Sequence, residues 1–536
     1  MHRKSGVLAH PTSFPSKYGV GDLGAGAYEF VDFLHKAKQR LWQILPLGPT
    51  GFGDSPYQSF STFAGNHYLI SPDLLCKEGY LAFKDIEHVP NFDAGAVDYG
   101  PVIEYKMDLF QKAFNRFREN ATTDQKKAYA RFCKDNKKWL DNYTLFVAIK
   151  RHFIEWRKNE INSPAQDAFR KANAKYLTED QIKDYYYGAV WNSWPEDIAG
   201  TGVSAKRKKN ATTEYKEILS EDMEFHSFLQ YEFFRQWDQL RAYAHEKNIQ
   251  IVGDVPIFVA MDSSDVWSEP ELFQLDKENN PKAVAGVPPD YFSETGQLWG
   301  NPLYDWTEHK KQNYAWWINR MSALLNVVDI IRIDHFRGFE SYWATPYGEV
   351  TAVKGKWVKG PGKAVFTAMS KELGDLPIIA EDLGIITDKV RALRDSLSFP
   401  GMAVLQFSFT PDAKNLYIPH NFGSSNVVLY TGTHDNDTSL GWYNTGPEHE
   451  KDYYRRYMNT NGEDVAWDLI RLAWGSSACY AIAPIQDLMV LDSWARMNTP
   501  GVSAGNWRFR YRSEMLTDEI ADRLAYLTEM FNRAGE

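Results

Sequence analysis

Eight short segments rich in apolar and β-branched residues recur along the chain, and most of them end in polar, glycine or proline residues. Continuous apolar runs of this length, separated by helical patterns, are typical of parallel strands that are buried on both faces. Eight such strand–helix units predict an α/β fold, a (β/α)8 barrel with helical insertions between its strands. The segments are Gly6–Ala9, Leu41–Leu47, Ile249–Val252, Val327–Ile333, Pro377–Ala380, Met402–Phe407, Val427–Tyr430 and Tyr480–Ala483.

The predicted strands are unevenly spaced, because about 200 residues separate the second from the third. Apolar residues recur at helical spacing in this stretch and just after it, in Ile103–Asn120, Leu140–Arg157 and Asp222–Lys247. The pattern predicts a division into the first part of the barrel (1–70), a mainly helical inserted subdomain (71–221) and the remainder of the barrel (222–536).

A second irregular stretch, residues 285–304, combines glycines and prolines with several aromatic residues. It shows no clear helical or strand period, so we expect a long loop without regular structure. Loops of this length are usually functional. We therefore expect residues 285–304 to be a functional loop.

Charge and composition exclude several classes of partner. The net charge of −10 argues against nucleic acid and against anionic membrane surfaces, both of which favour basic proteins. No run of about 18 apolar residues occurs, and the N-terminus lacks the apolar stretch of a signal peptide. Three widely spaced cysteines fit a reducing compartment. We expect a cytoplasmic protein that binds neither nucleic acid nor membranes; no pattern indicates an oligomeric state.

Four acidic residues follow predicted strands, namely Asp254, Asp334, Glu381 and Asp435. The carboxyl ends of barrel strands form one rim around one pocket, so these side chains should converge there. Each could instead cap the helix that follows, because Asp is a common N-cap residue. Gathering four carboxylates is unfavourable without a function, since like charges raise each other's pKa. With Arg332 two residues before Asp334, the pattern favours a functional site over four separate caps.

Such carboxylates suit the cleavage of glycosidic bonds. Retaining enzymes need a carboxylate nucleophile and a carboxylic acid proton donor about 5–5.5 Å apart. Arg332 should lower the pKa of Asp334 and keep that nucleophile ionised. Like charges around Glu381 should raise its pKa and keep it protonated. A third carboxylate can bind ring hydroxyls and favour the oxocarbenium-like transition state.

We expect neither a metal nor a cofactor. His434, Asp435 and Asp437 could serve as metal ligands, but no nearby His or Cys completes a transition-metal set. The stretch Gly19–Gly24 matches the G-x-G-x-x-G pattern of dinucleotide sites. It follows Ser-Phe-Pro-Ser-Lys-Tyr rather than a predicted strand, so it lacks the context that such a site requires.

Several motifs carry a family resemblance. Ile-Arg-Ile-Asp-His-Phe-Arg-Gly (331–338), Ala-Glu-Asp-Leu-Gly (380–384) and Thr-His-Asp-Asn-Asp-Thr (433–438) resemble the α-amylase clan. Three further motifs narrow the match to the amylomaltase type of 4-α-glucanotransferase, glycoside hydrolase family 77. They are Ser-Pro-Tyr-Gln (55–58), Gly-Asp-Val-Pro-Ile-Phe-Val (253–259) and the long stretch Gly-Val-Pro-Pro-Asp-Tyr-Phe-Ser-Glu-Thr-Gly-Gln-Leu-Trp-Gly-Asn-Pro (286–302). The resemblance runs from His10 to Val502, nearly the whole chain.

The resemblance implies a role for each matching position. It implies Asp334 as the nucleophile, Glu381 as the acid/base and Asp435 as the transition-state stabiliser. Around the sugar that becomes covalently bound it implies Tyr57, Asp254, Arg332, His335 and His434. On the acceptor side it implies Ser55, Asp290, Gln297, Trp299 and Asn506. It also implies that residues 285–304, which carry Asp290, Gln297 and Trp299, form a lid loop that folds over the active site.

The implied activity is transfer of a segment of an α-1,4-glucan to the 4-hydroxyl of a glucose or glucan acceptor, by retaining double displacement without a cofactor. Maltooligosaccharides, starch or glycogen-type glucans would be donors. An α-glucan hydrolase with the same residues is an alternative, since the two differ only in whether water or a sugar hydroxyl attacks the intermediate. A non-catalytic sugar-binding protein is a third possibility. It should lack one of the catalytic pair, and neither is missing.

Overall fold

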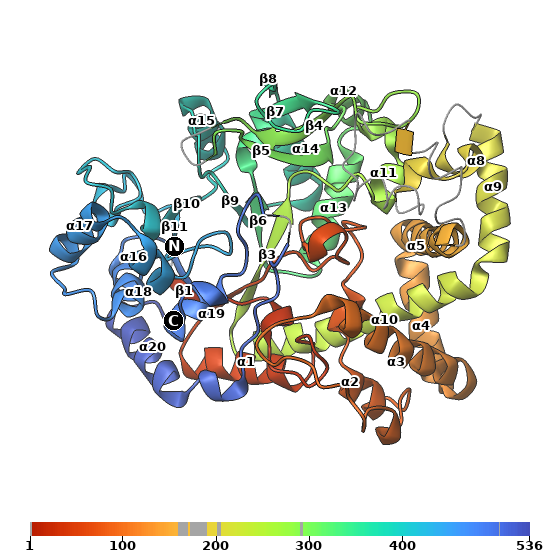
Figure 1. Ribbon diagram of the computed structural model, residues 1–536, viewed down its shortest axis with the longest axis horizontal. Helices are drawn as coiled ribbons and strands as arrows, with labels where there is room; N and C mark the ends of the chain where they lie inside the picture. Colours follow the sequence, from red (N-terminus) through yellow and green to blue (C-terminus); the bar gives the residue numbers. More distant parts are fainter. Residues whose placement is uncertain are drawn as a thin grey trace.

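An eight-stranded parallel sheet forms the centre of the computed structural model, which describes residues 3–158, 170–171, 190–200, 205–289, 293–502 and 504–535 (Figure 1). The strand order is β10-β11-β12-β1-β2-β3-β6-β9, and the Ala380 N–H donates to the Pro400 carbonyl at 2.9 Å, which joins the two edges. The predicted (β/α)8 barrel is therefore confirmed. The strands are β1 (Lys4–Leu8), β2 (Leu41–Gln43), β3 (Gln250–Pro256), β6 (Ile330–Asp334), β9 (Ile378–Ala380), β10 (Gly401–Val404), β11 (Val427–Tyr430) and β12 (Tyr480–Pro484).

Each of the eight predicted segments contributes one of these strands, with ends that shift by a few residues. The strand expected from Val327 begins at Ile330, because the Val327 and Val328 N–H groups still bind the Leu324 carbonyl at the end of helix α13 (Ala315–Leu325). The segment Met402–Phe407 leaves the sheet at Val404 and continues as a 3-10 turn. Apolar content alone does not mark these ends, since the turn residues are buried as well.

Helices cover the outside of the barrel between most pairs of strands (Figure 1). In the described part of the chain, β10 and β11 are joined only by the 3-10 turns η8 (Leu405–Phe407) and η9 (Pro419–Asn421). The other strand connections place helices against the sheet, where their apolar faces are buried. These helices are α1 (Ala25–Lys36), α10 (Ser220–Glu246), α13, α14 (Lys363–Leu373), α15 (Asp388–Ser396), α18 (Val465–Gly475) and α20 (Asp518–Met530).

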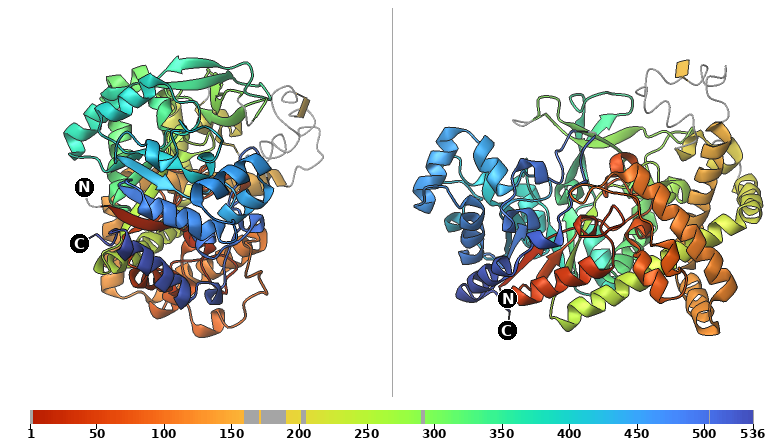
Figure 2. Two further views of the ribbon diagram at one scale, coloured as in Figure 1. Left: turned by 90° about the vertical axis from the view of Figure 1, so that its left-hand side faces the viewer. Right: turned by 60° about the horizontal axis from the view of Figure 1, so that its bottom comes forward.

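The described elements between β2 and β3 are helices and 3-10 turns that lie beside the barrel, as the right-hand view of Figure 2 shows. Aromatic rings join them to α10: Phe114 and Phe117 contact Phe228 with ring centroids 5.7 and 5.0 Å apart. The apolar stripe expected along α10 is thus the surface on which these helices pack. The α-helices are α2 (Pro72–Lys77), α3 (Tyr99–Asn120), α4 (Thr123–Asp135), α5 (Lys137–Lys158), α8 (Glu196–Ala199) and α9 (Ala205–Ile218).

A second, antiparallel sheet was not foreseen from the sequence. It contains β4 (Ala283–Val287), β5 (Gln297–Pro302), β7 (Ser341–Pro346) and β8 (Lys356–Lys359) in the order β5-β4-β7-β8. The expectation of a structureless loop over 285–304 is therefore wrong, because β4 and β5 pair across a connection closed by a hydrogen bond from the Gly296 N–H to the Ser293 carbonyl. The sheet lies at the carboxyl end of the barrel, since β7 follows β6 after a single 3-10 turn, η7 (Phe336–Phe339).

Among the described residues, no helix is both long enough and apolar enough to cross a lipid bilayer.

Candidate active site

The four predicted acidic residues stand at the carboxyl ends of barrel strands. Asp254 is in β3, Asp334 ends β6, Glu381 follows β9, and Asp435 follows β11. Strands β3, β6 and β9 are neighbours in the sheet, and the Glu381 N–H donates to the Ile333 carbonyl at 3.0 Å. The carboxyl group of Asp334 interacts electrostatically with the other three, so the structure brings all four together.

Arg332 is the positive charge at the centre of this group. Its side chain is 3% exposed, and its Nη1 donates both to Asp254 Oδ2 and to Asp334 Oδ1, the latter at 3.1 Å. The Tyr57 hydroxyl donates to the same Asp254 oxygen at 2.8 Å. One buried guanidinium therefore serves two carboxylates, and the register of β3 and β6, which pairs Asp254 with Arg332, fixes that arrangement.

The pKa of Asp334 is shifted in the direction opposite to the expected one. Burial raises this pKa well above its ordinary value, Arg332 lowers it, and the carboxylates of Asp254, Glu381 and Asp435 raise it further. Arg332 lowers the pKa as expected, but burial and the three like charges outweigh its effect, so the net shift is upward. Asp334 therefore competes with Glu381 for a proton.

Glu381 is held by the backbone of two neighbouring segments. Its Oε2 accepts from the His335 N–H and its Oε1 from the Leu383 N–H, both at 2.7 Å. Burial raises the pKa of Glu381, while Arg332 and these two backbone hydrogen bonds lower it. The upward direction matches the expectation for a proton donor. The main cause is burial rather than the neighbouring like charges that the sequence suggested.

His335 occupies an unusual backbone position directly after the nucleophile candidate. Its φ is +53°, in the left-handed region, which turns its N–H toward Glu381. Its ring meets the Trp299 indole edge-on, with centroids 4.8 Å apart. Burial lowers the pKa of His335 to about 3, so the ring is neutral at physiological pH. Residues other than glycine rarely adopt the left-handed backbone conformation, and those that do are often found at functional sites.

Three buried polar atoms in the site have no protein partner among the described residues. They are Asp254 Oδ1, His335 Nε2 and His434 Nδ1. Buried polar groups are nearly always hydrogen-bonded in native proteins, so unpaired ones point to a polar ligand or to water. Two neutral imidazoles and a carboxylate oxygen are well suited to the hydroxyl groups of a sugar.

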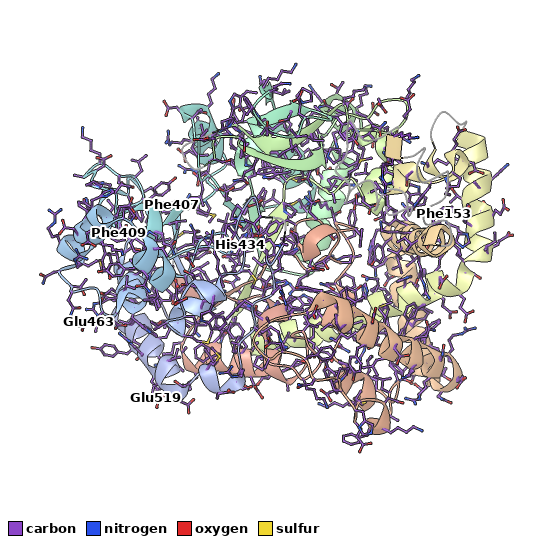
Figure 3. The ribbon with its side chains drawn as sticks, in the orientation of Figure 1. Phe153, Phe407, Phe409, His434, Glu463 and Glu519 are labelled. Atoms are coloured by element: carbon purple, nitrogen blue, oxygen red, sulfur yellow. The ribbon has the colours of Figure 1, made fainter. Side chains whose placement is uncertain are left out.

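Aromatic rings form one wall of the site. Tyr57 stacks on His434 with centroids 5.1 Å apart, and Trp507 contacts both rings at 5.7 and 6.0 Å. His434 lies near the middle of the molecule in Figure 3. Trp507 was not predicted, because it belongs to no motif. It is brought to the wall by a backbone with φ of +63° and by its N–H, which donates to the Met497 carbonyl at 2.8 Å.

Asp435 is held by a segment far along the chain. Its Oδ1 accepts from Asn498 Nδ2 at 2.6 Å, and its backbone carbonyl accepts from Arg496 Nη2 at 2.6 Å. His434 Nε2 lies 3.4 Å from the same Oδ1. Neither Asn498 nor Arg496 was singled out from the sequence, since contacts over more than 60 residues leave no periodic signal.

The other predicted site residues are placed as follows. The Ser55 hydroxyl accepts from the Tyr57 N–H at 3.2 Å, which puts it beside the aromatic wall. Gln297 and Trp299 lie on β5, and Trp299 Nε1 donates to Gln297 Oε1 at 3.1 Å. Asp290 lies outside the described residues.

Asn506 is engaged by its own loop. Its Oδ1 accepts from the Thr499 N–H at 2.9 Å, and its Nδ2 donates to the carbonyls of Thr499 and Val502 at 3.3 and 2.8 Å. The side chain therefore shapes the loop that carries Asn498 and Trp507.

A cavity of about 510 Å³ adjoins the site and has Tyr57 and Asp254 in its lining. Its lining also includes Trp139 from the inserted helix α5, Phe234 from α10 and Trp316 from α13. Its volume is in the range of small-molecule sites, and its lining mixes aromatic faces with amide and carboxylate groups. Such a lining suits carbohydrate.

The arrangement contains what retaining glycoside cleavage needs: an arginine-paired carboxylate, a second carboxyl with raised pKa on the adjacent strand, and a third carboxylate nearby. A family model described as 4-alpha-glucanotransferase matches residues 9–517 of the chain.

The chain belongs to the 4-alpha-glucanotransferase family, glycoside hydrolase family 77. It is 46% identical over 534 residues to a 4-alpha-glucanotransferase of Synechocystis, covering 99% of this chain and 98% of that one. It is 45% identical over 538 residues to a 4-alpha-glucanotransferase of Thermus thermophilus, covering 99% of each. The resemblance drawn from the motifs is confirmed, and the chain is an enzyme of this transferase family.

The fold agrees with a solved structure of the family. An amylomaltase from Streptococcus agalactiae, in complex with acarbose, superposes with a TM-score of 0.89 at 37% identity and full coverage of both chains. An amylomaltase from Corynebacterium glutamicum, 16% identical, shares the fold with a TM-score of 0.74.

Proposed function

We propose that the enzyme transfers segments of α-1,4-glucans by retaining double displacement, with Asp334 as nucleophile, Glu381 as acid/base and Asp435 as transition-state stabiliser. The observation that carries this proposal is the convergence of Glu381 and Asp435, from the ends of β9 and β11, on Asp334 at the end of β6, which Arg332 binds. The pairing of β6 with β9 supports the two roles, because it brings Asp334 and Glu381 to neighbouring strand ends.

In the first step, one Asp334 oxygen attacks the anomeric carbon of the donor. The glycosidic C–O bond breaks, and the Glu381 proton goes to the departing oxygen, which leaves as a free 4-hydroxyl on the released chain. The step requires the proton on Glu381 and the charge on Asp334. Arg332 supports that distribution, because its Nη1 contacts Asp334 directly.

In the second step, the 4-hydroxyl of an acceptor enters the place of the leaving group. Glu381, now a carboxylate, takes the proton of this hydroxyl while the hydroxyl oxygen attacks the anomeric carbon and the Asp334 ester bond breaks. Two inversions restore the α configuration. The enzyme returns with a proton on Glu381 and a charge on Asp334, so no external acid, base or oxidant is consumed.

We assign the sugar of the covalent intermediate to the pocket between Tyr57, Asp254, His335 and His434. The support is the set of unpaired buried atoms in that pocket, which matches hydroxyl groups in chemistry. Arg332 fixes Asp254 in place. Neutral imidazoles can both donate to and accept from a hydroxyl, whereas charged ones can only donate.

We assign the acceptor to the side of the site formed by β5 and by the segment that carries Ser55 and Tyr57, with Trp299 as a stacking surface. The support is the position of the Trp299 indole against His335, one residue after the nucleophile. Ser55, Gln297, Asp290 and Asn506 complete this assignment on the strength of the family motifs.

The proposed donors are maltooligosaccharides and starch or glycogen-type glucans, and glucose is a proposed acceptor. Relatives named 4-alpha-glucanotransferase and amylomaltase support glucans as the substrate class. We also propose that residues 71–221 fold as an inserted subdomain. A cytoplasmic location is proposed because Cys76, Cys133 and Cys479 are all free thiols.

Incubation with maltotriose alone tests the activity. A transferase produces glucose together with maltopentaose and longer chains, whereas a hydrolase produces only glucose and maltose. The Asp334→Asn variant is the control, and it should give neither pattern. Shorter products without any chain longer than maltotriose would refute transfer in favour of hydrolysis.

A further inference from the structure

A short segment, Arg496–Asn498, contacts the loop that carries the third carboxylate in several places. The Asn498 N–H donates to the His434 carbonyl at 3.1 Å, and Arg496 Nη2 donates to the Asp435 carbonyl at 2.6 Å. Asn498 Nδ2 donates to Asp435 Oδ1 at 2.6 Å, and Arg496 Nε donates to the Asn498 carbonyl at 2.8 Å. The segment thus binds the backbone of His434 and Asp435 and the side chain of Asp435 together.

These contacts matter because the Asp435 carboxylate has few other partners among the described residues. Its side chain is 44% exposed, and its loop follows β11 without a helix immediately after the carboxylate. Both side-chain contacts, with Asn498 and His434, fall on Oδ1. Among the described residues Oδ2 has no hydrogen-bond partner, so it remains available to a bound sugar.

We propose that Asn498 is a positioning residue that holds the Asp435 carboxylate in one orientation, with Oδ2 turned to the substrate. The inference rests on the proposed function of Asp435. A carboxylate can only accept hydrogen bonds, so Asn498 must present its NH2 group and not its carbonyl oxygen. A hydrogen bond of this charge-assisted kind is short and directional, as the 2.6 Å distance shows.

The orientation matters for catalysis because the third carboxylate has to bind the sugar hydroxyl groups more strongly in the transition state than in the ground state. Donor and acceptor must be aligned before the reaction, since reorientation during it would cost free energy. Asn498 supplies that alignment from the protein side. Loss of it should lower kcat more than it changes KM.

Replacement of Asn498 by aspartate gives a test with a pH signature. At acid pH, two carboxyl groups in contact share a proton, so the introduced side chain can donate an O–H to Asp435 in place of the lost N–H. Once the introduced carboxyl group ionises at higher pH, it repels Asp435 and the alignment is lost. The groups that face Asp435 are His434 and Tyr57 from the aromatic wall, Asp334 from β6, and Arg496, which binds its carbonyl.

These neighbours do not obscure the signature. Burial raises the pKa of Tyr57 well above its ordinary value and lowers the pKa of His434. Any change in the charge of these two groups is common to wild type and variant and cancels in the ratio of their activities. Titration of Asp334 is common to wild type and variant, and the ratio of the two activities at each pH removes it.

The experiment measures maltotriose disproportionation at about pH 5 to 8 by Asn498→Asp, Asn498→Leu and a control, Asn444→Asp. Asn444 lies on α16 (Ser439–Thr445), and its replacement adds the same charge away from the carboxylates. Asn498→Leu should lose about tenfold in kcat at every pH. The kcat of Asn498→Asp should approach that of wild type at about pH 5 and should fall by about tenfold or more by about pH 8. The control should follow wild type throughout.

Thermal midpoints show whether each variant is folded. If Asn498→Leu does not fold, Asn498→Asp still provides the test, because aspartate has nearly the same shape as asparagine. A constant ratio of Asn498→Asp to wild type across the pH range would overturn the positioning role. Asp435→Asn distinguishes an error in the proposed role of Asp435 from an error in the positioning role of Asn498. If Asp435→Asn keeps wild-type turnover, the proposed function of Asp435 is wrong. If it is inactive while both Asn498 variants match wild type, only the positioning role is wrong.

Discussion

Arg332 and Asp334 are joined by a hydrogen bond of 3.1 Å from Nη1 to Oδ1, yet this contact does not keep the carboxyl at its ordinary pKa. The same nitrogen also binds Asp254, and burial together with three nearby carboxylates outweighs the remaining attraction. The folded protein therefore binds a proton at Asp334 more tightly than the unfolded chain does. The ionised nucleophile is an arrangement that the fold maintains at a cost to its own stability.

Asp334→Asn should abolish activity and should raise the free energy of unfolding at about pH 7. Because the folded pKa is raised, the stability that goes with protonated Asp334 is present below the unfolded value of about 3.9 and is lost as pH rises through the folded pKa. The neutral amide escapes this loss. We expect a gain of about 1–2 kcal/mol near neutral pH, which should vanish near about pH 4.

Thermal midpoints of wild type and variant, measured from about pH 4 to 8, check this expectation. Asp388→Asn serves as the control, because Asp388 is fully exposed on α15 and its charge is not buried. A lower midpoint for Asp334→Asn at neutral pH, with a difference that does not vary with pH, would show that the carboxyl is not destabilising.

Glu381→Gln should slow the transfer of maltooligosaccharides by about 10²-fold or more, because the leaving 4-hydroxyl then departs without a proton. Donors with an activated leaving group, such as a glucosyl fluoride, should react in the first step at close to the wild-type rate. Single-turnover kinetics with both donors would show the contrast. Equal losses with both donors would argue against Glu381 as the proton donor.

The same residue sets a limit on the alkaline side of the pH profile. Burial raises the pKa of Glu381, so the protonated form that starts the reaction persists to higher pH than an ordinary glutamate allows. Activity should fall as pH rises through that pKa. With maltooligosaccharide donors, the residual activity of the Glu381→Gln variant should lack this alkaline decline. A decline that persists unchanged in the variant would have to come from another group.

Removal of divalent metal should leave the activity unchanged, because the proposed steps use only carboxyl groups and sugar hydroxyls. Within the described residues, no group of three or more His, Cys, Asp or Glu side chains is arranged to hold a metal ion. Dialysis against a chelator, followed by the maltotriose assay with and without added Mg²⁺, Ca²⁺ or Zn²⁺, measures this. Loss of activity that one of these ions restores would contradict the assignment of His434 and Asp435 to sugar binding.

The barrel could be predicted from the sequence because its strands are buried on both faces. Segments such as Val427–Tyr430 are continuously apolar, and that pattern has few other physical explanations. The second sheet was missed because its strands carry mixed residues. Gln297–Pro302 contains glycine, asparagine and proline, and much of it is only partly buried, so tertiary pairing with β4 decides its structure rather than its own propensity.

The acidic residues at strand ends could be predicted for the same reason as the strands, since barrel topology brings all strand ends to one rim. The residues that orient them could not. Asn498 reaches Asp435 from 63 residues away, and Trp507 reaches Tyr57 from the far end of the chain. The pKa of Asp334 also depended on how many carboxylates share Arg332, which spacing in the sequence does not reveal.

Trp299 should decide whether the intermediate goes to sugar or to water. Water is present at about 55 M, so a transferase has to favour the acceptor by holding it in a reactive position, where effective molarities can be far higher. The Trp299 indole lies edge-on to His335 and is only partly buried, which leaves a face for an acceptor sugar. Trp299→Ala should therefore lower transfer and raise the ratio of hydrolysis to transfer. If β5 merely packs against the barrel, transfer and hydrolysis should fall together as stability is lost.

The matched control is Trp357→Ala, which removes a tryptophan from β8 of the same small sheet. Trp357 is 40% exposed and contacts Arg337 and Trp343 rather than His335. Its loss should leave the ratio of hydrolysis to transfer unchanged. Glucose released by each route from a labelled donor, with and without excess acceptor, measures the ratio for both variants, and thermal midpoints establish that both are folded. An unchanged ratio in Trp299→Ala would refute the role of Trp299 in holding the acceptor, whereas a rise in Trp357→Ala as well would assign the effect to the sheet as a whole.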